Sequence, residues 1–153
     1  MKHMASDQTR RARAMLRSDK TMQALKESYA HKSEPLPVIS KDLEEQGRYI
    51  ADVYDRIGII VKDDPKVEEE LLENYGEVIG ILWKSLGRFV QEKWRDKDIP
   101  RYASNFERIG LDAIKKEEKF AKQQKEPRRE ITPPLRDRPN ELKVALSSEK
   151  TKE

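Results

Sequence analysis

Apolar residues recur at helical spacing through most of this 153-residue chain, and no alternating apolar run is long enough to form a half-buried strand. An amphipathic helix needs apolar residues three or four positions apart, whereas a strand needs them at every second position. The sequence therefore predicts an all-α fold, a compact bundle of about five helices.

Capping residues, prolines and glycines indicate where the first helices begin and end. The first helix is expected from about residue 6 to residue 30, with Ser18-Asp19 able to cap a new start within it. The second is expected from the N-cap Ser40 to a stop at Gly58. Ile59-Ile60-Val61 would then form an extended plug beneath the core, because no second strand is predicted to pair with it.

The second half of the chain predicts three further helices. A short acidic helix should begin at Asp64-Pro65, and Gly76 should interrupt it before the most apolar segment, from Val78 to Trp94. The apolar residues of that segment cover a wide arc, so it is predicted to be the central helix of the bundle. The last helix is expected to begin after Pro100 and to bury a face that includes Tyr102, Phe106, Ile109, Ala113 and Phe120.

The aromatic residues set the limits of the ordered domain. All 10 of them lie between Tyr29 and Phe120, so a core can be built there and scarcely elsewhere. Residues 123–153 contain four prolines, many charges and no aromatic residue, which predicts a disordered tail. We expect one domain over residues 5–122, and we interpret residues 1–4 as the remnant of an expression vector.

Several classes of chemistry lack the residues they need. The chain has no cysteine, which excludes disulfides, cysteine-ligated metal centres and a thiol nucleophile. His31 has no second histidine at metal-ligand spacing, and no phosphate-binding, dinucleotide-binding or hydrolase motif occurs. We therefore expect no catalytic residue, no cofactor and no metal. No apolar stretch is long enough to span a membrane, and we expect a cytoplasmic protein.

Charge is unevenly distributed along the chain. Residues 1–33 contain 8 Lys/Arg and 3 Asp/Glu, whereas residues 34–75 contain 5 and 12. A basic row on one face of the first helix consists of Arg10, Arg13, Arg17 and Lys20. Such a row suits phosphate groups on a nucleic acid or an anionic surface, but it can equally be a solvated face or a contact with the acidic segment of its own chain.

The two tryptophans have two interpretations. Trp83 and Trp94 are 11 residues apart, close to three helical turns, so both are expected along one edge of the most apolar helix. In the first interpretation they close the core of the bundle. In the second they line an exposed aromatic groove that binds a partner peptide or helix.

The order of features over about residues 9–120 resembles a known family. These features are a basic helix from Arg10 to Tyr29, an apolar helix from Leu43 to Gly58, an acidic helix from Asp64 to Glu73, the pair Leu82-Trp83, and the segment from Ile99 to Glu107. Together they resemble a family of uncharacterised bacterial all-helical domains that often follow a membrane-anchoring helix, which this chain lacks. The resemblance implies a helical fold and no particular activity.

These observations favour a protein–protein interaction or regulatory module over an enzyme. The partner is expected to be another protein or a second copy of the chain. The candidate binding residues are Arg10, Arg13, Arg17, Lys20, Trp83 and Trp94. The alternative hypothesis is a non-specific binder of nucleic acid or of anionic surfaces that uses the basic row.

Overall fold

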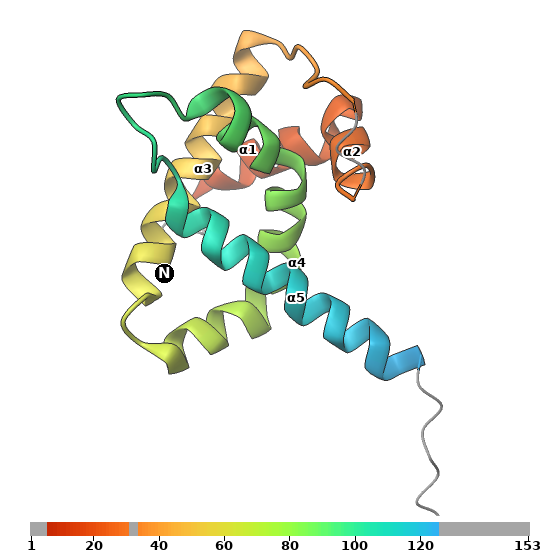
Figure 1. The fold of residues 1–153 in the computed structure, drawn as a ribbon, viewed down its shortest axis with the longest axis vertical. Helices are drawn as coiled ribbons and strands as arrows, with labels where there is room; N and C mark the ends of the chain where they lie inside the picture. The colour runs from red at the N-terminus through yellow and green to blue at the C-terminus, as the bar shows by residue number, and fades with distance from the viewer. Residues whose placement is uncertain (1–5, 31–33, 126–153) are drawn as a thin grey trace, which may run out of the picture. The chain divides into compact units, whose positions relative to one another are not determined.

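The computed structural model describes residues 6–30 and 34–125, and it is helical through most of them (Figure 1). The elements are α1 (Asp7–Ser18), α2 (Lys20–Glu27), α3 (Lys41–Val61), α4 (Pro65–Phe89), the π-helical segment η2 (Val90–Trp94) and α5 (Ser104–Lys125). The described residues contain no strand, which confirms the all-α prediction.

The chain divides into two units, residues 1–120 and residues 121–153. Of the second unit the structure describes only residues 121–125, which are exposed and form the end of α5. The predicted vector remnant, residues 1–4, and nearly all of the predicted tail, residues 126–153, lie outside the described residues.

Three of the predicted helix caps are present. Asp19 is extended, with φ −74° and ψ 128°, so it ends α1, and its carboxylate accepts a hydrogen bond from the backbone N–H of Met22 at 3.0 Å. Ser40 and Asp64 cap the first turns of α3 and α4 in the same way. Each cap satisfies a donor that the first turn of a helix leaves without a partner. The break within the predicted first helix is therefore confirmed.

The predicted stop at Gly58 is wrong, because α3 continues to Val61. Gly58 does not form a turn; it allows α5 to approach α3 closely. A β-carbon added at Gly58 would lie 2.8 Å from the Cβ atom of Asn105 at the start of α5. Ile59-Ile60-Val61 is accordingly helical and forms no extended plug. Ile59 and Ile60 are 53% and 68% exposed, and only Val61 is fully buried.

The predicted break at Gly76 is also wrong. α4 runs from Pro65 to Phe89, so the third and fourth predicted helices are one element, whose axis bends along its length (Figure 1). Glycine lowers helix stability without forcing a stop, and the apolar residues on both sides of Gly76 hold the helix against its neighbours.

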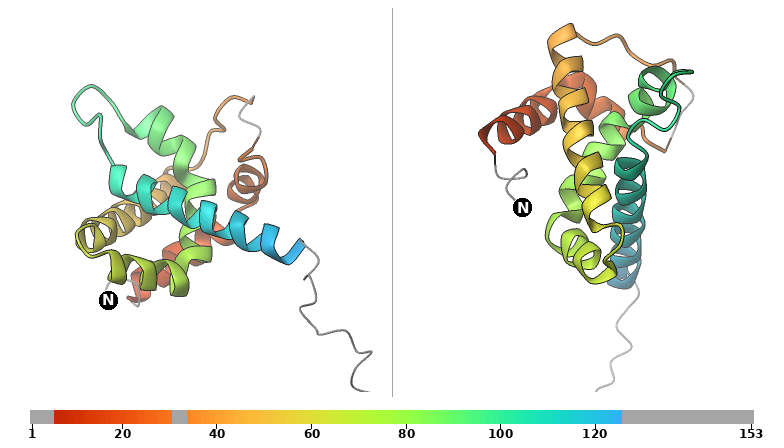
Figure 2. Two further views of the ribbon diagram at one scale, coloured as in Figure 1. Left: turned by 60° about the horizontal axis from the view of Figure 1, so that its bottom comes forward. Right: turned by 90° about the vertical axis from the view of Figure 1, so that its left-hand side faces the viewer.

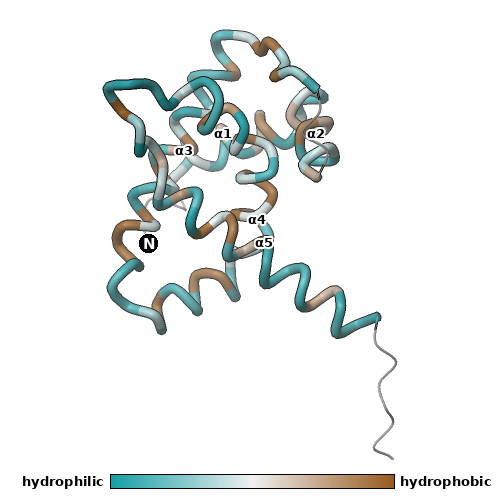
Figure 3. The backbone as a smooth tube through the Cα atoms, in the orientation of Figure 1, coloured by the Kyte–Doolittle hydropathy of each residue, from teal (hydrophilic) through white to brown (hydrophobic). Residues whose placement is uncertain are grey.

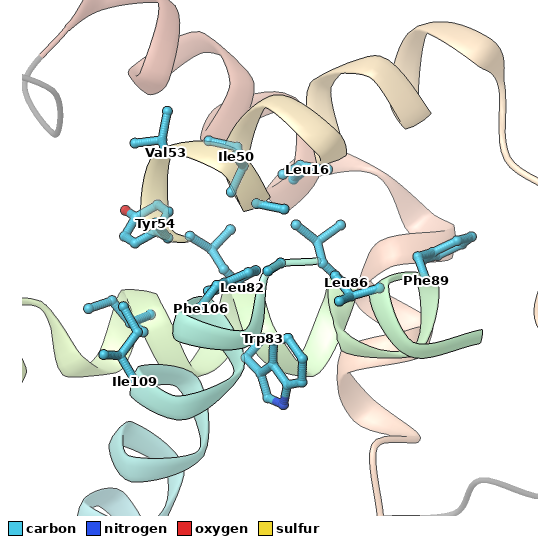
Figure 4. Close-up of a cluster of buried hydrophobic side chains, with 14 of the residues drawn as sticks. Leu16, Ile50, Val53, Tyr54, Leu82, Trp83, Leu86, Phe89, Phe106 and Ile109 are labelled. Carbon is cyan, nitrogen blue, oxygen red and sulfur yellow. The ribbon is translucent and has the colours of Figure 1, made fainter. Parts of the chain in front are cut away.

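α4 is the central helix, as its wide apolar arc predicts. Helices α2 and α3 pack against it, and α1 packs against α3. The close-up in Figure 4 shows core side chains from α1 (Leu16), α3 (Ile50), α4 (Leu82) and α5 (Phe106), and α2 adds the fully buried Met22. Two further views in Figure 2 show α5 running alongside this core.

The beginning of α5 differs from the prediction. Ala103 adopts a left-handed conformation with φ 54°, and the helix begins only at Ser104. Tyr102 therefore precedes the helix instead of lying on its buried face. Phe120, which the periodicity also placed on that face, is 62% exposed. The second half of α5 is largely hydrophilic, as Figure 3 shows.

Arg108 connects α5 to α3 and α4 through a hydrogen bond and an ion pair. Its Nη2 donates a hydrogen bond to the carbonyl oxygen of Gly58 at 2.9 Å, and its Nη1 forms an ion pair with Glu68 on α4. The carbonyl groups in the last turn of a helix lack partners within that helix. Arg108 thus satisfies one of these groups at the end of α3 and neutralises a carboxylate near the start of α4.

Asp55, on α3, caps the first turn of α5. Its Oδ1 accepts hydrogen bonds from the backbone N–H groups of Asn105 at 2.9 Å and Phe106 at 3.1 Å. We expect Asp55→Ala to lower the free energy of unfolding by about 1–2 kcal/mol, because both donors lose a charged acceptor. Urea denaturation measures this loss. Asp55→Asn keeps an acceptor oxygen and should lose less, and an alanine variant as stable as the native chain would contradict this role.

Candidate functional site

The predicted basic row does not form one continuous surface. Arg10 and Arg17 are exposed on α1, whereas Arg13 is half-buried and its Nη1 donates a hydrogen bond to the Tyr54 hydroxyl at 3.3 Å. Burial raises the pKa of Tyr54, and the nearby guanidinium opposes that shift. Lys20 is exposed but belongs to α2, beyond the helix break. One of the four cations is therefore directed inward, and the others are divided between two helices.

Both tryptophans belong to the core. Trp83 is 1% exposed and Trp94 is 3% exposed. Trp83 packs edge-to-face on Phe106 of α5, with ring centroids 5.2 Å apart, and Trp94 stacks on Phe89 at 5.6 Å. The π-helical turn of η2 changes the helical register between the two residues, so they do not share one edge. Neither side chain lines an exposed aromatic groove, and the interpretation of both as core residues is the correct one.

The surface best suited to binding is a groove between α4 and the pair α1–α2, which we call the basic groove. Its volume is about 290 Å³. Its apolar floor consists of Leu16 and Leu82, each 2% exposed, and the half-buried Ile81. The full lining is Leu16, Arg17, Gln23, Lys26, Glu27, Ile81, Leu82 and Ser85. A smaller hollow, bordered by Arg13, Arg17, Val78, Ile81 and Leu82, shares three of these residues.

The break at Asp19 creates this groove. It lets α1 pack against α3 while α2 packs against α4, so residues from both short helices border the same part of α4. Gln23 connects the two helices across the break, because its Nε2 donates a hydrogen bond to the carbonyl oxygen of Arg17 at 2.8 Å. Arg17 near the end of α1 and Lys26 near the end of α2 consequently both line the groove, and we call these two cations its rim.

The charges on this rim are not neutralised by any ion pair in residues 6–30 and 34–125. Among the described residues, neither Arg17 nor Lys26 forms an ion pair. Glu27 contributes one carboxylate to the same lining, so the groove keeps a net positive charge. An apolar floor beside cations that have no ion-pair partner offers both hydrophobic and electrostatic contacts to a ligand.

A second polar cluster, around Arg48 on α3, is satisfied internally. The Arg48 guanidinium lies between the rings of Trp94 and Tyr102, at 5.9 Å and 5.7 Å from their centroids. The Tyr102 hydroxyl donates a hydrogen bond to Asp52 at 2.8 Å, and burial together with that carboxylate raises the pKa of the tyrosine. These contacts tie the segment before α5 to α3, which is a structural role.

Glu44 belongs to the same structural cluster. It accepts hydrogen bonds from Nε1 of Trp94 at 3.0 Å and from Nζ of Lys93 at 3.2 Å. These two bonds hold the pKa of Glu44 below its usual value. The carboxylate thereby holds η2 against α3. It also gives the buried N–H group of the Trp94 indole a hydrogen-bond acceptor.

Another hollow, with a volume of about 620 Å³, lies beside Arg88, between α2 and residues 34–37. Its arginine is already engaged: Nη2 donates to the carbonyl oxygen of Glu34 at 2.7 Å, and Nε pairs with Glu92 at 2.7 Å. His31, the histidine considered as a ligand from the sequence, lies outside the described residues. We therefore place the candidate site in the basic groove.

Neither metal sites nor membrane-spanning helices are found in the parts of the chain that the structure describes. Residues 6–30 and 34–125 contain no group of three or more acidic or histidine side chains placed to hold a metal ion. No helix in the same ranges combines the length and the apolar character needed to cross a membrane. Comparisons with protein-family models, curated proteins and solved structures find no match. The resemblance to the uncharacterised bacterial domains stays a prediction.

Sequence reasoning identified one rim residue of the basic groove, Arg17, and missed Gln23, Lys26 and Ile81. Ile81 lies at the edge of the apolar arc of α4 and widens it. The unusual width of this arc was the feature of the sequence that could have predicted an apolar residue in the groove. The sequence did not predict that Lys26 lines the groove, because only the change of chain direction at Asp19 brings this residue there.

Proposed function

We propose that this protein is a non-enzymatic interaction module that binds an acidic peptide segment of a partner protein in the basic groove. One observation carries the proposal: an apolar floor lies beside Arg17 and Lys26, and these cations form no ion pair within the described ranges. The occupant should present an apolar anchor side chain flanked by carboxylates.

The floor supplies the hydrophobic part of the binding. Ile81 is only half-buried, and it lies beside the buried side chains of Leu16 and Leu82. A side chain seated on this floor would gain about 25 cal/mol for each Å² of apolar surface removed from water. A groove of about 290 Å³ admits a single anchor residue rather than a whole helix face.

The rim supplies charge selectivity. Arg17 and Lys26 come from different helices, so a ligand must lie across the break at Asp19 to meet both. Opposite charges on the partner would accelerate encounter and fix its orientation more than they would add affinity. Binding should therefore weaken as ionic strength rises, since exposed charges are screened over about 10 Å at 0.1 M salt.

The floor also favours a peptide over the alternative ligand, a nucleic acid or anionic surface held by the basic row. Phosphate contacts need several exposed cations along one line. Arg13 instead donates to Tyr54, and Lys20 lies beyond the helix break. A phosphate backbone brings no apolar side chain for Ile81 and Leu82 to cover.

Photo-crosslinking from the groove tests the proposal. We would replace Glu27, an exposed lining residue, with p-benzoylphenylalanine and irradiate the protein in lysate of its source cells, with and without prior nuclease treatment. The matched control carries the same photo-crosslinker at Val38, which is 97% exposed and outside the groove. We expect crosslinked peptides that are acidic, contain an apolar residue and are absent from the control. Basic peptides, or products that disappear with nuclease treatment, would overturn the proposal.

Charge reversal then tests the rim. For a synthetic copy of the crosslinked peptide, Arg17→Glu with Lys26→Glu should raise the dissociation constant at least about tenfold, which corresponds to about 1.4 kcal/mol. The control, Arg10→Glu with Lys20→Glu, makes the same change in net charge outside the groove lining. An equal loss in the control would show that the basic row binds the ligand instead of the groove.

A further inference from the structure

A second groove lies on a different face of α4, between its first half and α5, and we call it the Phe120 groove. Its volume is about 500 Å³. Leu72 and Gly76 line it from α4, and Ala113 and Phe120 line it from α5. Phe120 is 62% exposed, more than any other aromatic side chain in the described part of the chain.

The backbone of α4 at Gly76 forms part of the groove surface. A β-carbon added there would meet, among the described residues, only the Cβ atom of Leu72 within 4 Å, at 3.9 Å. The space above Gly76 is therefore unfilled, and the glycine itself is buried at the bottom of the groove, so a flat ring can lie above it. The groove thus combines an unfilled apolar hollow with an exposed aromatic ring at its edge.

The charges of the two walls are complementary to one another. Glu73 and Glu77 lie on the α4 wall and Lys116 on the α5 wall. None of these three residues forms an ion pair within residues 6–30 and 34–125, whereas Glu117 on the α5 wall is already paired with Lys84 at 3.7 Å. One wall thus presents carboxylates that lack a cation, and the other presents a cation that lacks a carboxylate.

We propose that the Phe120 groove is the interface of a homodimer, in which Phe120 of each copy lies over Gly76 of the other. A two-fold axis brings the same patch of both copies together, so such a patch must be complementary to itself. This patch supplies the protruding ring, the hollow that accepts it and charges of both signs. The same axis places Lys116 of each copy against Glu73 and Glu77 of the other. The inference is independent of the proposed function, because the two grooves share no lining residue.

Sedimentation of the full chain tests the dimer. Between about 1 μM and about 500 μM protein, we expect the mean mass to rise from that of one copy toward that of two. Phe120→Asp should raise the dissociation constant of the dimer at least about tenfold, and the fold should persist because this side chain is exposed. A native chain that stays monomeric throughout, or a dimer unaffected by Phe120→Asp, would overturn the proposal.

A charge exchange tests the two-fold geometry. Lys116→Glu alone, and Glu73→Lys with Glu77→Lys alone, should each weaken the dimer by about tenfold, because like charges then face each other twice. Mixing the two variant proteins should restore association, since every carboxylate in the mixed dimer again faces a lysine. If the mixture associates no better than either variant by itself, this arrangement of the two copies is wrong.

Discussion

Replacing Trp83 by alanine is expected to lower the free energy of unfolding by about 3–5 kcal/mol, the range for large aromatic side chains in a packed core. The indole is 1% exposed and lies between α4 and α5, where it meets Phe106 at nearly a right angle, 88° (Figure 4). Truncation leaves a cavity that these helices cannot close without moving. Urea denaturation, followed by the fluorescence of the remaining Trp94, measures the loss.

Trp83→Phe is the matched control. It keeps an aromatic ring against Phe106 and removes less volume, so its loss should be clearly smaller than that of Trp83→Ala. If the alanine variant loses less than about 1 kcal/mol, α5 does not depend on this contact for its position.

The ends of the helices show how far the sequence predicts the fold. Asp19, Ser40 and Asp64 were identified correctly as caps, because the hydrogen bond of an N-cap is local and depends on residues within three positions. The predicted stops at Gly58 and Gly76 are wrong, because a glycine that ends a helix and a glycine within a helix look the same in one sequence. The structure shows the difference: Gly58 lies against Asn105, and neither glycine has a positive φ.

The candidate site was less predictable than the fold. The helical periodicity correctly grouped Arg10, Arg13 and Arg17 on α1, but periodicity alone does not show which neighbour a face meets. Arg13 donates to Tyr54, which is 41 positions away in the sequence. The basic groove depends in the same way on the packing of α2 against α4, so its floor and rim become visible only in three dimensions.

Gly110→Ala is expected to lower the free energy of unfolding by about 3 kcal/mol, the upper end of the usual cost of overpacking, although alanine favours a helix by about 1 kcal/mol over glycine. An added β-carbon would lie 2.6 Å from both the Cβ and Cγ atoms of Trp83. The Cβ atom of Trp83 is fixed by the backbone and cannot rotate away from the added carbon, so α4 or α5 itself must move. Urea denaturation of the variant measures the cost.

Gly76→Ala is the control for the Gly110 prediction, since it makes the same chemical change on a helix where the nearest atom, at 3.9 Å, leaves room. At about 1 μM protein, where we expect a monomer, it should raise the free energy of unfolding by about 0.5–1 kcal/mol through helix propensity alone. The opposite signs of the two substitutions separate close packing from helix propensity. In a Trp83→Ala background the Cγ contact is gone, so Gly110→Ala should cost less there than in the native chain. If Gly110→Ala lowers the free energy of unfolding equally in both backgrounds, the strain does not arise at the contact between Gly110 and Trp83.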